Sequence, residues 1–462
     1  MFTVKEILRA TKGQLPQGNS STKIRGISTD TRTLKAGELF ITLKGRNFKG
    51  QEFVDAALKK SASGIIVEQS IKHTFPNDFV VIKVKNTLIA LGDIANFHRR
   101  KLNPKVIAIT GSSGKTTAKD MLACILSKKY NVLKTKGNEN NQVGVPLTLL
   151  KLRRKHDIAV VELGTNHPGE IKRLVDVASP DIGILINIGL SHIEFLKDFE
   201  GVYREKLDLF KGLKRSGAIL FNYDDTYLRR IKRQSKNGPS QYTFGLRDGC
   251  SFQVSNVIKQ GAYIKFLLNQ KTWIRIRSFA RHNIYNCLAA VACARICNVS
   301  YKTIREALER FNFPVGRGIP RTINGIKIID DTYNSNPLSL SSAIDSLSEY
   351  TGKRKILICA DMLELGKQSQ KLHFDIGRKI AASNIDMLMT LGDLSYWVSQ
   401  GAKRNRFSGM TICHCRNHQD VINRLHGTIR SNDVILVKGS RSMQMEKIVK
   451  DIQKKLTKNK KG

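Results

Sequence analysis

Two kinds of hydrophobic pattern divide the chain. The first part, residues 1–83, contains a predicted helix near 51–60 and short apolar strands at 39–43, 64–67 and 79–82. From about residue 84, continuous apolar runs such as 106–110 alternate with amphipathic helices. Strands that are apolar on both faces and separated by helices are typical of a parallel sheet covered on both sides. The pattern therefore predicts an α/β protein.

A second break in the pattern lies around residues 313–318, where Gly and Pro interrupt the helices. Apolar strands then resume at 326–329, 356–359, 387–390 and 434–437. We therefore predict three α/β domains, over residues 1–83, 84–315 and 316–462, the last with a Rossmann-like arrangement of strands and helices.

Polar and charged residues follow the ends of the predicted parallel strands. They are Glu162, His192, Asp330, Asp331, Asp361 and Lys438. Ligands of open parallel sheets bind beyond the carboxyl ends of the strands, so we expect these residues to lie near a site.

The composition adds a strong positive charge. Lys and Arg number 78 against 38 Asp and Glu, which gives +40. A nucleic-acid partner, attraction of an anionic small substrate, and compositional drift would each explain this charge. The basic residues are spread along the chain, so we favour drift with substrate steering, and expect no nucleic acid. No apolar run is long enough to span a membrane and the N-terminus lacks a signal-peptide core, so we expect a cytoplasmic protein.

The segment Thr110-Gly-Ser-Ser-Gly-Lys-Thr-Thr117 lies between a predicted buried strand and a helix predicted over 115–129. Its glycines let backbone N–H groups face phosphate oxygens at the positive end of the helix. Lys115 would reach the β- and γ-phosphates, and the Thr116 hydroxyl would bind Mg²⁺. The expected phosphate-binding residues are Gly111, Ser112, Ser113, Gly114, Lys115, Thr116 and Thr117. The segment predicts an ATP or GTP site.

This shortened loop and several other blocks resemble the Mur ligases, ATP-dependent enzymes that form amide bonds in peptidoglycan precursor synthesis. The blocks are 137–148, 161–170, 187–194 and 281–286. Residues 330–337, 360–366 with His373, and 437–443 are similar to the branch of the family that adds a dipeptide. Residues 28–32 and 39–45 resemble a domain that binds the UDP-sugar substrate.

The resemblance implies a three-domain ligase with ATP and Mg²⁺ as cofactors. Its substrates would be UDP-N-acetylmuramoyl-tripeptide and D-alanyl-D-alanine, joined through an acyl phosphate, and we expect a monomer. The first domain would bind the UDP-sugar, the second ATP and the third the dipeptide.

The resemblance also implies roles for individual residues. Catalytic roles fall to Lys115, His192, Lys206 and Arg317, and metal ligation to Thr116, Glu162, His192 and a carbamate formed on Lys206. Adenine recognition falls to His282, Asn283 and Asn286, although an Asn at a helix start is equally typical of a cap. Substrate-binding roles fall to Ser28, Asp30, Arg32, Asn138, Asn140, Asn141, Asp331, Tyr333, Asn334, Asn336, Asp361 and Lys438.

Three alternatives remain open on the sequence. A relative that adds one amino acid would share most motifs, but the Asp-Asn-Pro-Arg signature of the branch that adds the third residue is absent. A folate polyglutamate synthetase has two domains and would leave residues 1–83 unexplained. A P-loop ATPase acting on nucleic acid would need a coherent basic stripe with aromatic residues, and aromatics make up only 7% of this chain.

Overall fold

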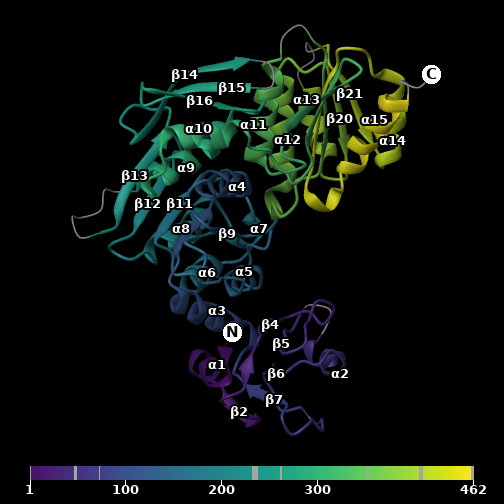
Figure 1. The fold of residues 1–462 in the computed structure, drawn as a ribbon. Helices are drawn as coiled ribbons and strands as arrows, with labels where there is room; N and C mark the ends of the chain where they lie inside the picture. Colours follow the sequence, from purple (N-terminus) through teal and green to yellow (C-terminus); the bar gives the residue numbers. More distant parts are fainter. Residues whose placement is uncertain are drawn as a thin grey trace.

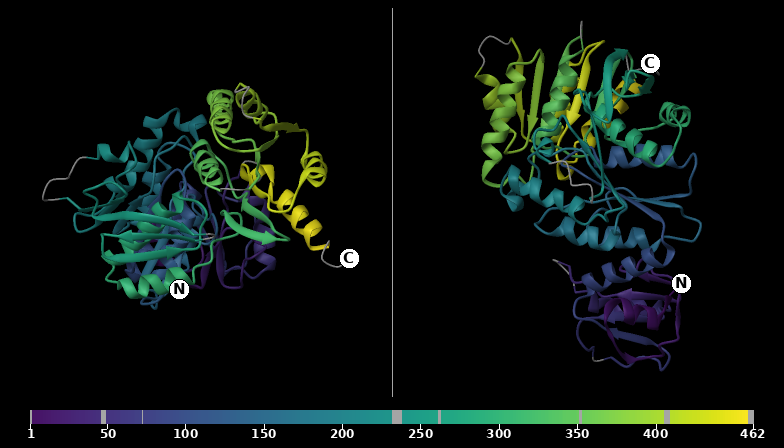
Figure 2. Two further views of the ribbon diagram at one scale, coloured as in Figure 1. Left: turned by 90° about the horizontal axis from the view of Figure 1, so that it is seen from above. Right: turned by 90° about the vertical axis from the view of Figure 1, so that its left-hand side faces the viewer.

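The computed structural model describes residues 2–45, 49–71, 73–231, 238–260, 263–350, 353–404 and 409–458. Three sheet-containing units follow one another in chain order along the molecule, with the N-terminal unit at one end and the C-terminal unit at the other (Figures 1 and 2). The α/β class is confirmed. The division at residues 83 and 315 stays a prediction, and it falls in the connections before α3 and β17.

The N-terminal unit contains a five-stranded sheet in the order β2-β7-β6-β5-β4. Its strands are β2 (Gln14–Gln17), β4 (Gly26–Ser28), β5 (Glu38–Ile41), β6 (Gly64–Val67) and β7 (Val80–Lys83), beside a small pair of β1 (Phe2–Thr3) and β3 (Lys23–Ile24). Its helices are α1 (Val4–Thr11), η1 (Gly50–Phe53) and α2 (Val54–Lys59). α3 (Thr87–Leu102) packs against α1 on one side and against α5 and α6 on the other, which joins this unit to the next.

The central sheet has the order β16-β15-β14-β13-β12-β11-β8-β10-β9. Its strands are β8 (Lys105–Thr110), β9 (Val132–Lys134), β10 (Ile158–Glu162), β11 (Ile182–Leu185), β12 (Ala218–Asn222), β13 (Ser240–Gly245), β14 (Phe252–Gln260), β15 (Tyr263–Leu268) and β16 (Thr272–Ile276). The neighbouring strands from β9 through β10, β8, β11 and β12 to β13 pair in parallel, as predicted. β14 also pairs in parallel with β13, and the antiparallel β14-β15-β16 extension that follows was not predicted by the sequence pattern.

Helices cover both faces of the central sheet because its strands are apolar on both sides. α4 (Lys115–Leu126), α9 (His282–Ile296) and α10 (Tyr301–Glu309) pack on one face. α5 (Gly144–Leu150), α6 (Glu170–Ala178) and α8 (Phe199–Lys211) pack on the other, where short α7 (Ile193–Leu196) and η2 (Leu228–Arg230) also lie. β8 therefore lies between β11 and β10 in the covered parallel part of the sheet, and the chain passes from its carboxyl end to α4.

The C-terminal sheet has the order β17-β18-β22-β19-β20-β21. Its strands are β17 (Ile319–Ile323), β18 (Ile326–Asp331), β19 (Lys355–Ala360), β20 (Met387–Leu391), β21 (Thr411–Cys415) and β22 (Val434–Lys438). α11 (Pro337–Ser348), α12 (Ser369–Ala381) and α13 (Tyr396–Lys403) cover one face, and α14 (His418–Thr428) and α15 (Glu446–Lys458) cover the other. Two 3₁₀ turns, η3 (Gly366–Gln368) and η4 (Arg441–Met443), complete the unit. Only β17 runs antiparallel, so the prediction of a covered parallel sheet is confirmed except at this edge.

Candidate active site

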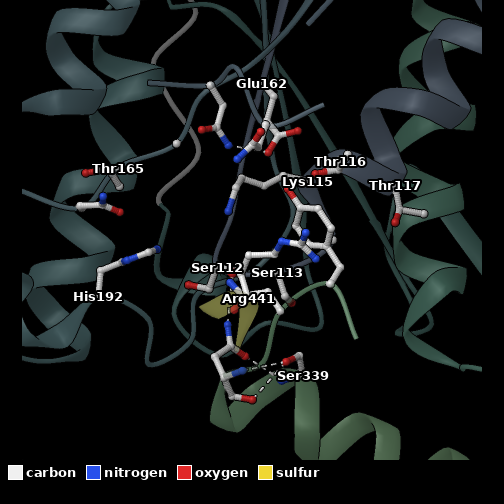
Figure 3. Close-up of a pocket in the computed structure, with 18 of the residues that line it drawn as sticks. Ser112, Ser113, Lys115, Thr116, Thr117, Glu162, Thr165, His192, Ser339 and Arg441 are labelled. Atoms are coloured by element: carbon white, nitrogen blue, oxygen red, sulfur yellow. Dashed lines mark hydrogen bonds between the residues drawn. The ribbon is translucent and has the colours of Figure 1, made fainter. Parts of the chain in front are cut away.

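A cavity of about 530 Å³ lies where the carboxyl ends of the central strands face the C-terminal unit. Figure 3 shows its lining, with Lys115, Thr116 and Glu162 from the central unit and Ser339 on a helix of the C-terminal unit. Twenty of the residues selected from the sequence line this cavity. They are Ser112, Ser113, Gly114, Lys115, Thr116, Thr117, Asn138, Asn140, Asn141, Glu162, His192, His282, Asn283, Asn286, Arg317, Asp331, Tyr333, Asn334, Asn336 and Lys438.

The phosphate loop follows β8 directly, and α4 begins at Lys115. Gly114 has φ +79°, and a Cβ there would lie 2.0 Å from Asn286 Oδ1, so the position excludes any side chain. The predicted nucleotide-binding residues of the loop and of α9 therefore meet. Asn283 donates to Ser278 Oγ at 2.9 Å, and Asn286 donates to Asn283 Oδ1 at 2.8 Å.

A neighbouring strand end holds the loop in shape. Asn187 accepts a hydrogen bond from Ser113 N at 2.9 Å, and Ser112 Oγ donates to Gly189 O at 2.8 Å. The Ser112 hydroxyl therefore faces the segment after β11. Asn187 begins the block 187–194 and had no predicted role, although its place directly after a buried strand was a usable signal.

Lys115 is partly buried, and its Nζ donates to Gly111 O at 2.8 Å across the loop. Gly111 does not line the cavity, but its carbonyl holds the lysine in place. Burial lowers the pKa of Lys115, while the nearby Glu162 carboxylate opposes this effect. A cation held in a water-poor loop is suited to pair with the oxygens of a transferred phosphoryl group.

Glu162 ends β10, next to the loop, and its side chain is almost fully buried. Its Oε1 accepts from Asn140 at 2.8 Å, whereas its Oε2 has no hydrogen-bond partner among the described residues. Lys119 Nζ lies 3.7 Å from Oε2 and supplies the cation that a buried carboxylate needs. Lys119 was not among the residues predicted for the site, although it lies one helical turn after Lys115 on α4.

Arg317 reaches the phosphate loop from the start of the C-terminal unit. Its guanidinium donates to Thr116 Oγ1 at 3.0 Å and lies over the Tyr333 ring, 3.6 Å from the centroid. Arg317 therefore contacts the phosphate loop from the C-terminal unit, and its role toward the nucleotide stays a prediction. Asn336 adds a second bridge, since its amide donates to Ser112 O at 3.3 Å while its Oδ1 caps α11.

His192 contacts the C-terminal unit. Its Nδ1 lies 2.5 Å from Glu364 Oε2, and the imidazole holds the pKa of Glu364 below its usual value. The structure therefore engages the Nδ1 face of His192 with a carboxylate of the neighbouring unit.

His282 opens α9 near Asp331 and Lys438. Burial lowers the pKa of His282 to about 4, against the opposing pull of Asp331, so the ring is neutral at pH 7. Its Nδ1 has no partner among the residues that the structure describes. A neutral imidazole with a free ring nitrogen is suited to hydrogen bonding rather than to charge neutralisation.

Lys206 does not line the cavity, but it is 1% exposed on α8 and lies within electrostatic reach of Lys115. Burial, followed by repulsion from Lys115, lowers the pKa of Lys206 well below its usual value. The adjacent Glu205 is buried too, and it accepts hydrogen bonds from the backbone N–H groups of Gly169 and Ile171 and from the Thr165 hydroxyl. Lys206 is therefore no solvated helical lysine.

Several residues predicted to bind the dipeptide already contact other groups of the protein. Asp331 and Lys438 end the paired strands β18 and β22, and their side chains form an ion pair at 2.7 Å. Asp361 lies outside the cavity lining; its Oδ1 accepts from Ser395 N at 2.7 Å and so fixes the turn after β20. The structure does not bring Asp361 to the cavity, because the turn after the neighbouring strand β20 uses its carboxylate.

The predicted sugar-nucleotide residues also lie away from this cavity, in the turn after β4 of the N-terminal unit. Arg32 pairs with Asp30 at 2.7 Å, and Ser28 Oγ donates to Asp30 O at 3.1 Å. These three residues are close together because they are close in sequence. They do not line the cavity, so their predicted role in binding the UDP-sugar stays a prediction. Asn141 is used locally as well, since its Oδ1 accepts from Gly144 N at the start of α5.

The fold and this loop define a P-loop nucleotide-binding protein. Two family descriptions match the chain: the Mur ligase middle domain over residues 109–294 and the Mur ligase, glutamate ligase domain over residues 316–441. The chain belongs to the Mur ligase family.

Individual relatives match over nearly the whole chain. The UDP-N-acetylmuramoyl-tripeptide–D-alanyl-D-alanine ligase of Bacillus subtilis (strain 168) is 33% identical, covering 97% of this chain and 98% of its own. The ligase of the same name from Escherichia coli (strain K12) is also 33% identical, covering 98% of both.

Solved structures agree with these relatives. MurF from Acinetobacter baumannii superposes with a TM-score of 0.90 at 30% identity, covering 98% of this chain and 99% of that one. MurF from Thermotoga maritima in complex with ADP superposes with a TM-score of 0.84 at 25% identity, covering 94% and 98%. The three-domain α/β architecture and the use of ATP by a carbon–nitrogen ligase follow for this chain.

Among the described residues, no helix is both long and apolar enough to cross a bilayer.

Proposed function

We propose that this enzyme joins D-alanyl-D-alanine to UDP-N-acetylmuramoyl-tripeptide, with ATP activating the tripeptide carboxylate. The observation that carries the proposal is the shared cavity, in which a phosphate loop faces strand-end residues of the C-terminal unit. The full-length similarity to ligases of that name supports the same substrates. An alternative, addition of a single amino acid, has no feature of the cavity in its favour.

Amide formation from a carboxylate needs activation, because a carboxylate oxygen is a poor leaving group. Transfer of the γ-phosphoryl group of ATP gives an acyl phosphate; the amine then attacks the acyl carbon, and phosphate leaves from the tetrahedral intermediate. The protein supplies position and charge neutralisation. Lys115 would approach the transferred group from the loop and Arg317 from the C-terminal unit, and the cavity-lining residues His282, Asn283 and Asn286 would bind the adenine.

A magnesium ion fits the residues present. Glu162 presents a buried Oε2 that has no hydrogen-bond partner in the described part of the chain, and Thr116 adds a hydroxyl at the start of α4. The described residues hold no group of three His, Cys, Asp or Glu side chains suited to a metal. Magnesium prefers oxygen ligands and commonly combines one or two carboxylates with substrate phosphates, so its further ligands would be phosphate oxygens of ATP. When bound, the ion would neutralise phosphate charge. His192 is a candidate to orient this site from its Nε2 side.

The carbamate on Lys206 is consistent with the burial of this residue. A neutral amine adds CO₂ and releases a proton, and the lowered pKa of Lys206 raises the share of the neutral amine. The product replaces an ammonium repelled by Lys115 with a carboxylate attracted to it. We therefore propose carbamylated Lys206 as a further oxygen ligand near the phosphates.

The remaining assignments concern the outer parts of the substrates. Ser28, Asp30 and Arg32 would bind the UDP group, and Asn138, Asn140 and Asn141 would line the path toward the phosphate loop. Asp331, Tyr333, Asn334, Asn336 and Lys438 would border the dipeptide. A cytoplasmic monomer remains our expectation, as do the three domains divided at residues 83 and 315.

The central test is the choice of amine. With ATP, Mg²⁺ and UDP-N-acetylmuramoyl-tripeptide present, phosphate release should require D-alanyl-D-alanine and should far exceed release with D-alanine or L-amino acids. Single alanine lacks the second residue's carboxylate and leaves its binding groups unpaired. Efficient use of diaminopimelate, lysine or glutamate, with no response to the dipeptide, would overturn the proposed function.

Salt should act unequally on the two substrates. The chain carries +40, and a UDP-peptide with a diphosphate and several carboxylates responds to this field, whereas a zwitterionic dipeptide hardly does. Raising ionic strength should therefore increase the KM for the UDP substrate more than the KM for D-alanyl-D-alanine. Equal changes in both constants would leave compositional drift as the explanation of the charge.

A further inference from the structure

The dipeptide assigned above ends in a carboxylate, which needs a cationic partner in the cavity. Among the described residues that line the cavity, the Lys and Arg side chains are Lys115, Arg317, Lys438 and Arg441. Lys115 is held against Gly111 O, and Arg317 lies between Thr116 and the Tyr333 ring. Both face the phosphate loop, so the candidates on the dipeptide side are Lys438 and Arg441.

Lys438 is already committed to neighbouring groups. Its side chain is 3% exposed, and its Nζ lies 2.7 Å from Asp331 Oδ2 and donates to Asn334 O at 2.9 Å. A buried ammonium with a carboxylate partner carries little unbalanced charge. Binding a second carboxylate there would leave two anions competing for one cation.

Arg441 is in a different position. It begins η4, three residues after Lys438, and its side chain is 63% exposed at the cavity. Among the described residues, it forms an ion pair with Glu446 alone, at 3.3 Å, and a solvent-exposed pair of this kind is weak. The side chain can therefore exchange Glu446 for a substrate carboxylate. Figure 3 shows Arg441 among the labelled residues of the cavity.

The backbone that carries Arg441 is fixed even though its side chain is exposed. Ser440 N donates to Asp361 O at 3.1 Å, and Ser440 Oγ accepts from Leu363 N at 2.9 Å. A Cβ on Gly439 would lie 2.6 Å from Met445 and 2.9 Å from Ala360, so this segment packs closely against the strand ends. The backbone at Arg441 is therefore held in place, and its planar guanidinium can donate two parallel hydrogen bonds to one carboxylate.

We propose that Arg441, rather than Lys438, binds the C-terminal carboxylate of the incoming dipeptide and so distinguishes a dipeptide acid from a dipeptide without that charge. The proposal rests on the function proposed above. Lys438 then acts as a positioning residue, holding Asp331 and the carbonyl of Asn334 at the edge of the site.

The test compares D-alanyl-D-alanine with D-alanyl-D-alanine amide, which keeps the attacking amine but lacks the terminal charge. The wild-type enzyme should use the acid at least about ten-fold better in kcat/KM, since a hydrogen-bonded charge pair contributes that much. In Arg441→Gln the ratio should fall to near one, through a raised KM for the acid. The KM for ATP should stay unchanged, and Arg441→Lys should restore part of the preference.

A matched control is Arg424→Gln, which removes an exposed arginine of the same unit that pairs with Asp420 at 2.7 Å outside the cavity lining. It should leave the ratio as in the wild type. An unchanged acid-to-amide ratio in Arg441→Gln, or a wild type that uses both dipeptides equally, would overturn the role of Arg441 while the function stands. A wild type that ignores both dipeptides and uses a single amino acid would instead overturn the proposed function and this inference with it.

Discussion

Replacing Lys115 by alanine is expected to lower turnover at least about a hundred-fold while leaving the fold intact. The lysine is the cation that the phosphate loop holds closest to its own backbone, with Nζ 2.8 Å from Gly111 O. Its loss removes the charge that would stabilise the transferred phosphoryl group. Because burial already lowers the pKa of Lys115, removing it relieves a desolvated charge and should cost little stability.

The measurement is phosphate release with all three substrates, beside thermal unfolding of the same samples. Lys128→Ala is the matched control, because this lysine is exposed just after the end of α4. It should behave as the wild type in both assays. Retention of more than a few per cent of wild-type turnover in Lys115→Ala would argue against the assigned phosphate loop.

The second large effect is expected for Lys206→Ala. An exposed helical lysine can usually be removed without consequence, whereas this buried lysine should prove almost as important as Lys115. If its carbamate supplies a carboxylate near the phosphates, the alanine variant leaves a space that small carboxylic acids can enter. Activity should therefore return in part when acetate or formate is added, a response that simple unfolding would not produce.

Lys211→Ala provides the control on the same helix, since Lys211 is exposed and pairs only with nearby Asp208 among its described neighbours. Its activity should equal that of the wild type and should not respond to added acids. Labelling with ¹³C-bicarbonate should give a carbamate signal in the wild type that is missing in Lys206→Ala. Full activity of Lys206→Ala, or a wild type without that signal, would contradict the carbamate.

The architecture could be predicted largely because its signal is local. Strands buried on both faces read as continuous apolar runs, so β8, β10, β11 and β12 were recognisable one by one. The extension formed by β14, β15 and β16 was not, although its hairpins pair residues close in sequence, such as Leu268 with Thr272. Its strands mix exposed and buried positions at the sheet edge, which gives a weaker pattern than a central strand.

The candidate site also contains some residues whose position could be predicted from local sequence and others whose contacts could not. The conformation of residues 110–117 is determined by the segment itself. Gly114 permits the turn, and the start of α4 adds the positive end of a helix. Asp361 was placed at the site from its strand-end position, yet its carboxylate serves the turn at Ser395. Position along a strand predicts where a side chain begins, but not which neighbour it contacts.

By itself, the sequence determined the class of fold, the nucleotide loop and the family, since each depends on short segments whose geometry is encoded by adjacent residues. Only the tertiary structure decided which charges are available. It paired Lys119 with Glu162 and Lys438 with Asp331, and it left Arg441 exposed at the cavity. Ion pairing depends on the distance between side chains and on their burial, and packing alone brings together residues as far apart in the chain as Lys438 and Asp331.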